Sequence, residues 1–269
     1  MTVKGKIKKL FAQKEYIPIF HPVSSSKEFE EKVILISGGS GGIGLEVAKS
    51  LQEAGAVVVI AGTNENKLNR IKVETNLETV VMNYSYPETF KSVIEKVTKK
   101  FGKIDIFISS AGVHTENVDF WTMNQKEFDR VMDINLKGVF FACQTIGKYM
   151  VDNKIKGSIL LISSSRGSEP AWSPYGISKW GLKGLTEGLA QIFIPYGINV
   201  NSIAPGSTAT GLIGFKEGDS ITSEENGMNR LVMPDEVATL AKLLVSDAGK
   251  MIDGEVIHIA AGRGTFDIR

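Results

Sequence analysis

Cysteine and histidine are both scarce in this sequence. It contains one cysteine, Cys143, and three histidines among 269 residues. A single cysteine excludes an internal disulfide and indicates a reducing compartment, so we expect a cytoplasmic location. The histidines have no metal-ligand spacing, so we expect no metal site and metal-free chemistry.

The sequence also has no excess of charge of one sign and no long apolar run. The chain has 31 basic and 30 acidic side chains, which gives no general attraction for nucleic acid. No stretch is long enough to span a membrane. The lysine-rich residues 1–31 lack the apolar core of a signal peptide, and we expect an extension that lies outside the fold, solvated or packed on its own or a neighbouring subunit.

From Lys32 onward, short β-branched runs alternate regularly with longer amphipathic segments. The runs are typical of strands buried on both faces, and the segments between them are typical of crossover helices. This pattern predicts one α/β domain over residues 32–269, a doubly wound parallel sheet of about seven strands with helices on both faces. Ligands are expected at the carboxyl ends of the strands. The expected strands lie within residues 32–39, 55–62, 77–83, 103–112, 157–165, 197–206 and 255–262.

A cluster of glycines, SGGSGGIG from Ser37 to Gly44, joins the first expected strand to a helix. Glycines allow the backbone to approach a pyrophosphate closely, and the helix N-terminus holds the phosphates with its N–H groups and its dipole. A merely tight turn is the alternative. The position between a buried strand and a helix favours dinucleotide binding.

In the stretch SPYGISKWG, Tyr175 and Lys179 lie four residues apart at an expected helix start. Side chains at i and i+4 share a helix face, so both can reach one reacting atom. A nearby cation favours phenolate, and we expect Lys179 to lower the pKa of Tyr175. Taken alone, the pair is more typical of a core tyrosine beside a solvated lysine.

Five stretches together resemble the motifs of the classical short-chain dehydrogenase/reductase family, and in particular its 3-oxoacyl-[acyl-carrier-protein] reductase-like members. The resemblance implies a Rossmann fold, a nicotinamide cofactor and hydride transfer between that cofactor and a small-molecule carbonyl or secondary alcohol. The matching stretches are the glycine cluster, SSAG (109–112), INLKGVF (134–140), the YxxxK of Tyr175 and Lys179, and NSIAPGSTAT (201–210).

The same resemblance implies roles for individual residues. Tyr175 is the expected general acid/base, and Lys179 lowers its pKa and binds the nicotinamide ribose. Asn135 holds a water in a proton relay, or alternatively is a structural asparagine in a distorted helix. Ser164 binds the substrate oxygen, with Ser163 as the alternative because the gap before Tyr175 is shorter than usual. The expected cofactor-binding residues are Gly38, Ser40, Gly41, Gly42, Ile43, Gly44, Thr63, Asn64, Asn83, Ala111, Gly112, Tyr175, Lys179, Pro205, Gly206 and Thr208.

The end of the second expected strand bears on the choice of cofactor. Gly62 stands where NAD-selecting relatives carry a carboxylate that would repel a 2′-phosphate. Thr63 and Asn64 are neutral donors, and Lys67 or Arg70 is within reach, so NADP(H) is favoured over NAD(H). Against this, no basic residue stands in the glycine loop.

The segment 211–230 is expected to form a small lid, with Ile213 and Phe215 making apolar contacts and no arginine pair to mark a carboxylate or phosphate. His114 is expected to be a solvated loop residue, with a position in the pocket lining as the alternative. The helices around 135–150 and 175–193 are apolar on more than one face. We therefore expect a homodimer or homotetramer, with Gly181, Gly184 and Gly188 allowing close approach.

An alternative function is a non-catalytic NAD(P)-binding sensor or regulatory protein, because fold does not imply function. The presence of Asn135, Ser164, Tyr175 and Lys179 favours the enzyme. A sugar-nucleotide epimerase or dehydratase on a related fold is disfavoured, because no sizeable substrate domain follows the sixth expected strand.

Overall fold

The structure is a computed structural model that describes residues 28–264. Most of the expected N-terminal extension, residues 1–27, lies outside the described residues. Phe29 is 2% exposed and packs in the core, and its backbone N–H donates to the carbonyl of Ala54 at 3.0 Å. The fold therefore begins before the boundary expected at Lys32.

A seven-stranded sheet in the order β3-β2-β1-β4-β5-β6-β7, with every pair parallel, forms the centre of the protein. This confirms the predicted doubly wound sheet. The order reverses between β1 and β4, which creates a crevice at their carboxyl ends. The strands are β1 (Val33–Ser37), β2 (Val57–Gly62), β3 (Glu78–Val81), β4 (Ile106–Ser109), β5 (Ser158–Ile162), β6 (Asn199–Pro205) and β7 (Val256–Ile259).

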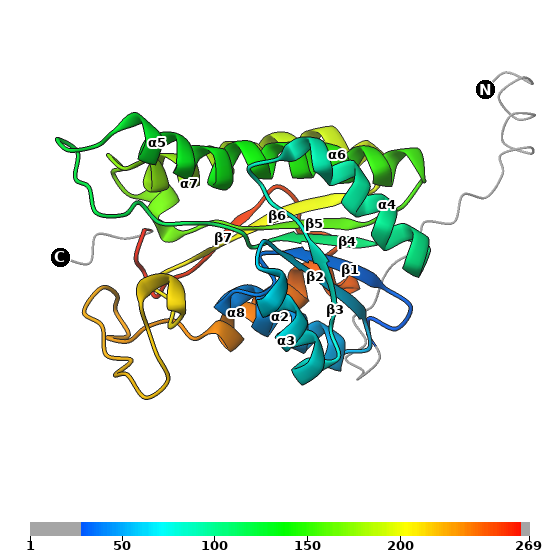
Figure 1. Ribbon diagram of the computed structural model, residues 1–269, viewed down its shortest axis with the longest axis horizontal. Helices are drawn as coiled ribbons and strands as arrows, with labels where there is room; N and C mark the ends of the chain where they lie inside the picture. The colour runs from blue at the N-terminus through cyan, green and yellow to red at the C-terminus, as the bar shows by residue number, and fades with distance from the viewer. Residues whose placement is uncertain (1–27, 265–269) are drawn as a thin grey trace, which may run out of the picture.

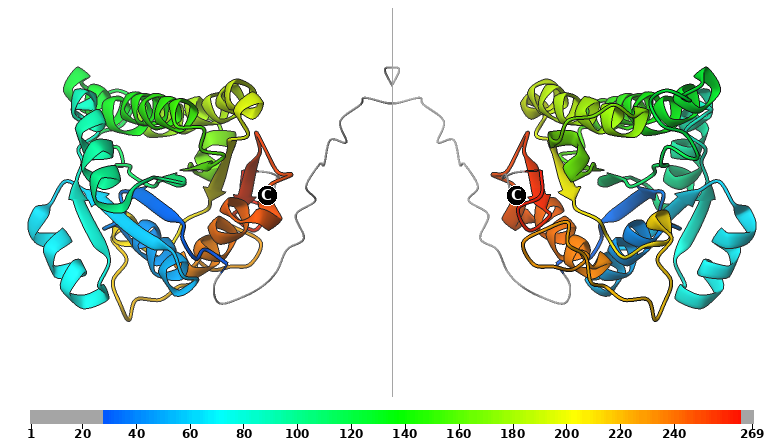
Figure 2. Two further views of the ribbon diagram at one scale, coloured as in Figure 1. Left: turned by 90° about the vertical axis from the view of Figure 1, so that its right-hand side faces the viewer. Right: turned by 90° about the vertical axis from the view of Figure 1, so that its left-hand side faces the viewer.

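Helices cover both faces of the sheet (Figure 1). Three pack below it in that view: α2 (Gly42–Glu53), α3 (Glu65–Thr75) and α8 (Pro234–Val245). Four lie above it: α4 (Phe90–Phe101), α5 (Gln125–Met132), α6 (Val139–Asp152) and α7 (Pro174–Phe193). The two views turned by 90° about the vertical axis show the same layers (Figure 2).

The strand pattern explains these two layers. In β1, Val33 and Leu35 belong to the core under α4, α6 and α7, whereas Ile34 and Ile36 belong to the core beside α2 and α8. Successive side chains of a strand point to opposite faces, so an unbroken apolar run serves both cores. Burial of each such side chain contributes roughly 1.5–3 kcal/mol. The edge strands β3 and β7 are only partly buried, which corrects the expectation of burial on both faces for all seven.

Helices α5 and α6 are joined by a π-helical turn, Asp133–Gly138, which contains Asn135. π-turns inside α-helices commonly mark functional sites. The segment 211–230 follows β6 at the carboxyl end of the sheet. It begins with the short 3-10 helix Gly211–Ile213 and continues as an irregular excursion, drawn in gold in Figure 1, with one antiparallel bridge between Thr222 and Arg230. Among residues 28–264, no helix is both long enough and apolar enough to cross a membrane.

Candidate active site

A cavity of about 850 Å³ lies at the carboxyl ends of the strands, where ligands were expected. The segments that follow β1, β4, β5 and β6 all line it, as do residues of the segment 211–230, which was expected to form a lid. The crevice between β1 and β4 is thus continuous with the place where Tyr175 and Lys179 lie.

The glycine loop after β1 is packed too closely for side chains. A Cβ atom at Gly38, where φ is +66°, would lie 2.5 Å from the backbone nitrogen of Ala111. A Cβ at Gly42 would lie 2.6 Å from Cγ2 of Thr210. The glycines therefore let the loops after β1, β4 and β6 meet around the cavity.

The N-terminus of α2 opens into the same cavity. Its N-cap residue is Gly41, which has no side chain to bond the first N–H groups, and no acidic residue stands in the first turn. By contrast, Asn64 caps α3 and Ser173 caps α7. A helix end without a side-chain cap beside a cavity suits an anionic group, and the residues here fit the pyrophosphate of a dinucleotide.

Tyr175 stands in the first turn of α7, as predicted. Pro174 occupies the first helical position, and Ser173 accepts a hydrogen bond from the N–H of Gly176 at 3.2 Å. The ring of His114 stacks on Tyr175 with centroids 4.0 Å apart. The side chains of Tyr175 and Ser164 share a hydrogen bond, so the phenol is fixed from two sides.

The expected lowering of the Tyr175 pKa by Lys179 is not what the structure shows. Burial raises the pKa of Tyr175, and the hydrogen bond with Ser164 opposes that rise. The charges of Arg166 and Arg263 also lower it, but less than burial raises it. The phenol therefore keeps its proton at neutral pH.

Lys179 lies beneath the cavity, 4% exposed. Its Nζ donates to the carbonyl oxygen of Ile162 at 3.1 Å and lies 5.6 Å from the ring centroid of Tyr175. Burial lowers the pKa of Lys179 to about 8. The two side chains share one helix face and one cavity, as the spacing predicted, and a core tyrosine beside a solvated lysine is excluded.

Asn135 is 1% exposed, and both ends of its amide are engaged by one residue. Its Oδ1 accepts from the N–H of Val113 at 2.8 Å, and its Nδ2 donates to the carbonyl of Val113 at 2.9 Å. Asn135 thereby fixes the cavity-lining loop after β4 from within the π-turn. Its part in a proton relay stays a prediction.

Ser163 and Ser164 differ in where they bond. The hydroxyl of Ser163 donates to the carbonyl of Lys179 at 3.4 Å, within the packing between β5 and α7. The hydroxyl of Ser164 bonds the Tyr175 hydroxyl and accepts from the backbone N–H of Arg166 at 3.2 Å. Of the two alternatives, Ser164 is the one beside the phenol.

Most of the residues expected to bind cofactor line the cavity: Gly38, Ser40, Gly41, Gly42, Ile43, Gly44, Thr63, Asn83, Ala111, Gly112, Tyr175, Lys179, Pro205, Gly206 and Thr208. Asn64 does not. Its Oδ1 accepts from the backbone N–H of Lys67 at 2.9 Å to cap α3, whereas Lys67 itself lines the cavity near Gly62. In the lid, Ile213 is a lining residue and Phe215 is not.

Sequence reasoning favoured the wrong position for His114 and missed two further features of the cavity. His114, expected to be solvated with the pocket lining as the alternative, lines the cavity and stacks on Tyr175, and burial lowers its pKa. Tyr84 joins the ends of β1 and β4 through hydroxyl contacts of 2.5 Å to Ser37 and 2.9 Å to Ser109. Two arginines, Arg166 and Arg263, also line the cavity. The sequence held a signal for these residues, because each of the four follows the carboxyl end of a strand, and these ends meet at the same edge of the sheet.

Known proteins share this arrangement. The family model described as enoyl-(acyl carrier protein) reductase matches residues 38–263. The 3-oxoacyl-[acyl-carrier-protein] reductase FabG of Rickettsia conorii is 34% identical over 238 residues, which cover 86% of this chain and 96% of that protein. The FabG of Thermotoga maritima is 31% identical, with 87% of this chain and 98% of that protein covered. The chain belongs to the short-chain dehydrogenase/reductase family.

Solved structures agree with this membership. The 3-ketoacyl-(acyl-carrier-protein) reductase of Brucella melitensis, complexed with NADH, superposes with a TM-score of 0.78 at 28% identity. The alignment covers 87% of this chain and 99% of that one. This family member is therefore an oxidoreductase that transfers a hydride between a nicotinamide cofactor and a carbonyl or secondary alcohol.

Proposed function

We propose that the protein reduces the carbonyl of a small oxo compound with NADPH, with Tyr175 as proton donor, Ser164 and Lys179 as its partners and Asn135 holding the adjoining loop. The observation that carries the proposal is that Tyr175, Ser164 and Lys179 line the same cavity as the uncapped end of α2. The retained proton of Tyr175 favours the reductive direction.

The chain's own residues then divide the work. When bound, the nicotinamide supplies the hydride that the carbonyl carbon accepts. Ser164 donates a hydrogen bond to the carbonyl oxygen and holds it beside Tyr175, whose hydroxyl gives its proton to that oxygen. The Lys179 cation stabilises the phenolate that remains. The glycine loop and the N-terminus of α2 hold the phosphates.

Ser164→Ala is expected to lower kcat for carbonyl reduction by about 10- to 100-fold, because it removes one charge-assisted hydrogen bond to the developing oxyanion. Ser163→Ala is the matched control, since it deletes a hydroxyl that bonds the Lys179 carbonyl instead. Steady-state kinetics with one good ketone compares the two variants. A larger loss in Ser163→Ala would assign the substrate oxygen to the other serine.

The preference for NADPH over NADH rests on the surroundings of Gly62. Gly62, Thr63 and Lys67 line the cavity, so a 2′-phosphate there meets a cation and no carboxylate from β2. We expect kcat/KM for NADPH to exceed that for NADH by about 10- to 100-fold, or ~1.4 to 3 kcal/mol.

Gly62→Asp is expected to invert this preference, because the new carboxylate repels a 2′-phosphate and accepts a hydrogen bond from a ribose hydroxyl. Its Cβ would lie 3.0 Å from Oγ of Ser40, a hydroxyl that can rotate away. Gly62→Asn has the same steric demand without the charge and should retain the preference for NADPH. A parent enzyme that prefers NADH, or an unchanged ratio in Gly62→Asp, contradicts the selection by Gly62.

We also propose that two copies of the chain pack through α6 and α7, as a homodimer or within a homotetramer. Five large apolar side chains on these helices are at least 36% exposed: Phe140, Phe141, Ile177, Trp180 and Ile192. Gly184 and Gly188 have open space beside them, whereas Gly181 packs on Leu136 of its own chain. Light scattering at micromolar concentration should report at least twice the chain mass of 29.2 kDa, and a monomer would contradict the proposal.

A further inference from the structure

Two arginines face the part of the cavity where the substrate must lie. Arg166 stands in the short helix Ser165–Ser168 after β5, and Arg263 follows β7. Both line the cavity together with Tyr175 and Ser164. The Arg263 side chain is only 12% exposed, whereas that of Arg166 is half exposed.

One carboxylate holds the two guanidinium groups together. Oε1 of Glu169 lies 2.9 Å from Nε of Arg263, and Oε2 lies 2.9 Å from Nη1 of Arg166. Glu169 is 18% exposed, so this bridge is largely shielded from water and keeps both arginines in place. A single carboxylate cannot neutralise two guanidinium groups, so the group retains one positive charge.

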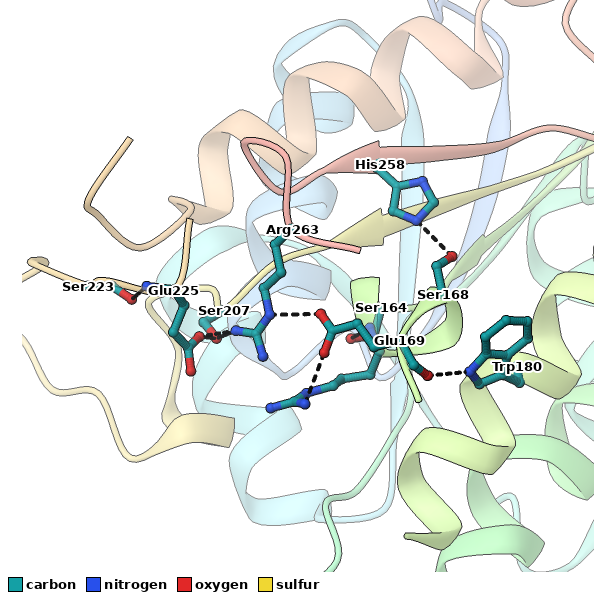
Figure 3. Close-up of polar contacts among 10 residues, drawn as sticks. Ser164, Ser168, Glu169, Trp180, Ser207, Ser223, Glu225, His258 and Arg263 are labelled. Atoms are coloured by element: carbon teal, nitrogen blue, oxygen red, sulfur yellow. Dashed lines mark hydrogen bonds and ion pairs between the residues drawn. The ribbon is translucent and has the colours of Figure 1, made fainter. Parts of the chain in front are cut away.

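A second carboxylate, from the lid, supplies that missing negative charge. Glu225 contacts both Nη1 of Arg263 and the hydroxyl of Ser207, which also accepts from Arg263 at 3.0 Å. Figure 3 shows Arg263 with Glu225 and Ser207 on one side and Glu169 on the other.

The Glu225 carboxylate is ionised and accessible. Burial raises its pKa, but the hydrogen bond from Ser207 and the charge of Arg263 together lower the pKa by more than burial raises it. Its side chain is 47% exposed, and Glu225 itself lies outside any helix or strand. Arg263 and Ser207 thus already bind a carboxylate at the cavity wall, and that carboxylate belongs to the side chain that can most easily leave.

We propose that Arg263, Arg166 and Ser207 bind the carboxylate of an oxo-acid substrate, and that Glu225 occupies this site until the substrate displaces it. The proposal rests on the carbonyl reduction proposed above and names its substrate class. When Glu225 leaves, two guanidinium groups and the Glu169 carboxylate remain, and their net positive charge matches one substrate carboxylate.

The shared cavity favours a short acid. Tyr175, which meets the carbonyl oxygen, and Glu225, whose place the substrate carboxylate takes, line the same cavity as Arg166. The carbonyl and the carboxylate of the substrate must therefore both fit within this cavity. A short oxo acid, in which few bonds separate carbonyl and carboxylate, satisfies this arrangement.

Acetoacetate and its methyl ester form the test pair, because they share the reducible carbonyl and differ in the negative charge. With NADPH in excess, the parent is expected to have a kcat/KM for acetoacetate about 10-fold or more above that for methyl acetoacetate. Arg263→Met should lower this acid-to-ester ratio by about 30-fold or more. Lys91→Met, which removes an exposed cation that does not line the cavity, should leave the ratio at the parent value.

Glu225→Gln keeps both arginines and protects the test against misfolding of the Arg263 variant. Loss of the competing carboxylate should lower KM for acetoacetate by about threefold or more and leave the preference for the acid intact. A parent that reduces the ester as well as the acid overturns the proposal. So does an Arg263→Met variant that loses both activities by the same factor.

Failure of the carbonyl reduction itself is distinguished by calorimetric titration. Suppose that neither compound is reduced. Tighter binding of acetoacetate than of methyl acetoacetate to the parent, together with loss of that difference in Arg263→Met, then supports the carboxylate site alone. Equal binding of the acid and the ester overturns the site.

Discussion

Tyr175→Phe is expected to lower kcat for carbonyl reduction by about 10²- to 10⁴-fold while leaving the affinity for NADPH nearly unchanged. The substitution removes only the hydroxyl that bonds Ser164. The ring remains to stack on His114, so the walls of the cavity keep their shape. Steady-state kinetics and a fluorescence titration with NADPH measure the two effects separately.

Tyr196→Phe is the matched control, because this tyrosine is 51% exposed and does not line the cavity. It should have the kcat of the parent. Turnover of Tyr175→Phe within tenfold of the parent would remove the phenol from the proton-transfer step.

Lys179→Met is expected to lower kcat/KM for reduction by about 100-fold or more below pH 8, because no cation then stabilises the phenolate left by proton transfer. Burial lowers the pKa of Lys179 to about 8, so the cation is present below that pH and lost above it. The parent's kcat/KM should therefore fall as the pH rises through about 8. In Lys179→Met this limb of the pH profile should be absent.

The control is Lys183→Met, one helical turn further along α7 and outside the cavity lining. This variant should retain both the kcat/KM of the parent and the fall of kcat/KM with rising pH near pH 8. A limb that persists in Lys179→Met belongs to another group and would contradict the assignment.

Much of the fold could be predicted because its signals are local. Within one strand, neighbouring apolar residues such as Val33 and Ile34 pack in the two different cores. In the loop after β1, the close packing at Gly38 and Gly42 leaves no room for a side chain. Tyr175 and Lys179 share a face because of their spacing alone. The burial of the edge strands β3 and β7 was overestimated, because their apolar runs resemble those of central strands. Only the sheet order reveals which strands lie at the edge.

The electrostatics of the site could not be predicted in the same way. Whether burial or a cation decides the pKa of Tyr175 depends on packing from β5, α7 and the loop after β4. Adjacent serines look equivalent in the sequence, but Ser163 bonds a carbonyl of α7 and Ser164 bonds the phenol. Arg263 and Glu169 are 94 positions apart, and they meet because parallel strands end at one edge of the sheet.

The central claim is that this cavity transfers a hydride to a carbonyl carbon with Tyr175 as proton donor. Its most direct test is a single turnover with NADPH carrying deuterium at the reactive position, run against acetoacetate, ketones, 3-oxoacyl thioesters, sugars and steroids and analysed by mass spectrometry. The account predicts one deuterium on the carbinol carbon of at least one product from the parent, and none from Tyr175→Phe in the same time. Binding of NADPH with no deuterium transferred to any of these compounds would contradict the account and indicate a nucleotide-binding sensor instead.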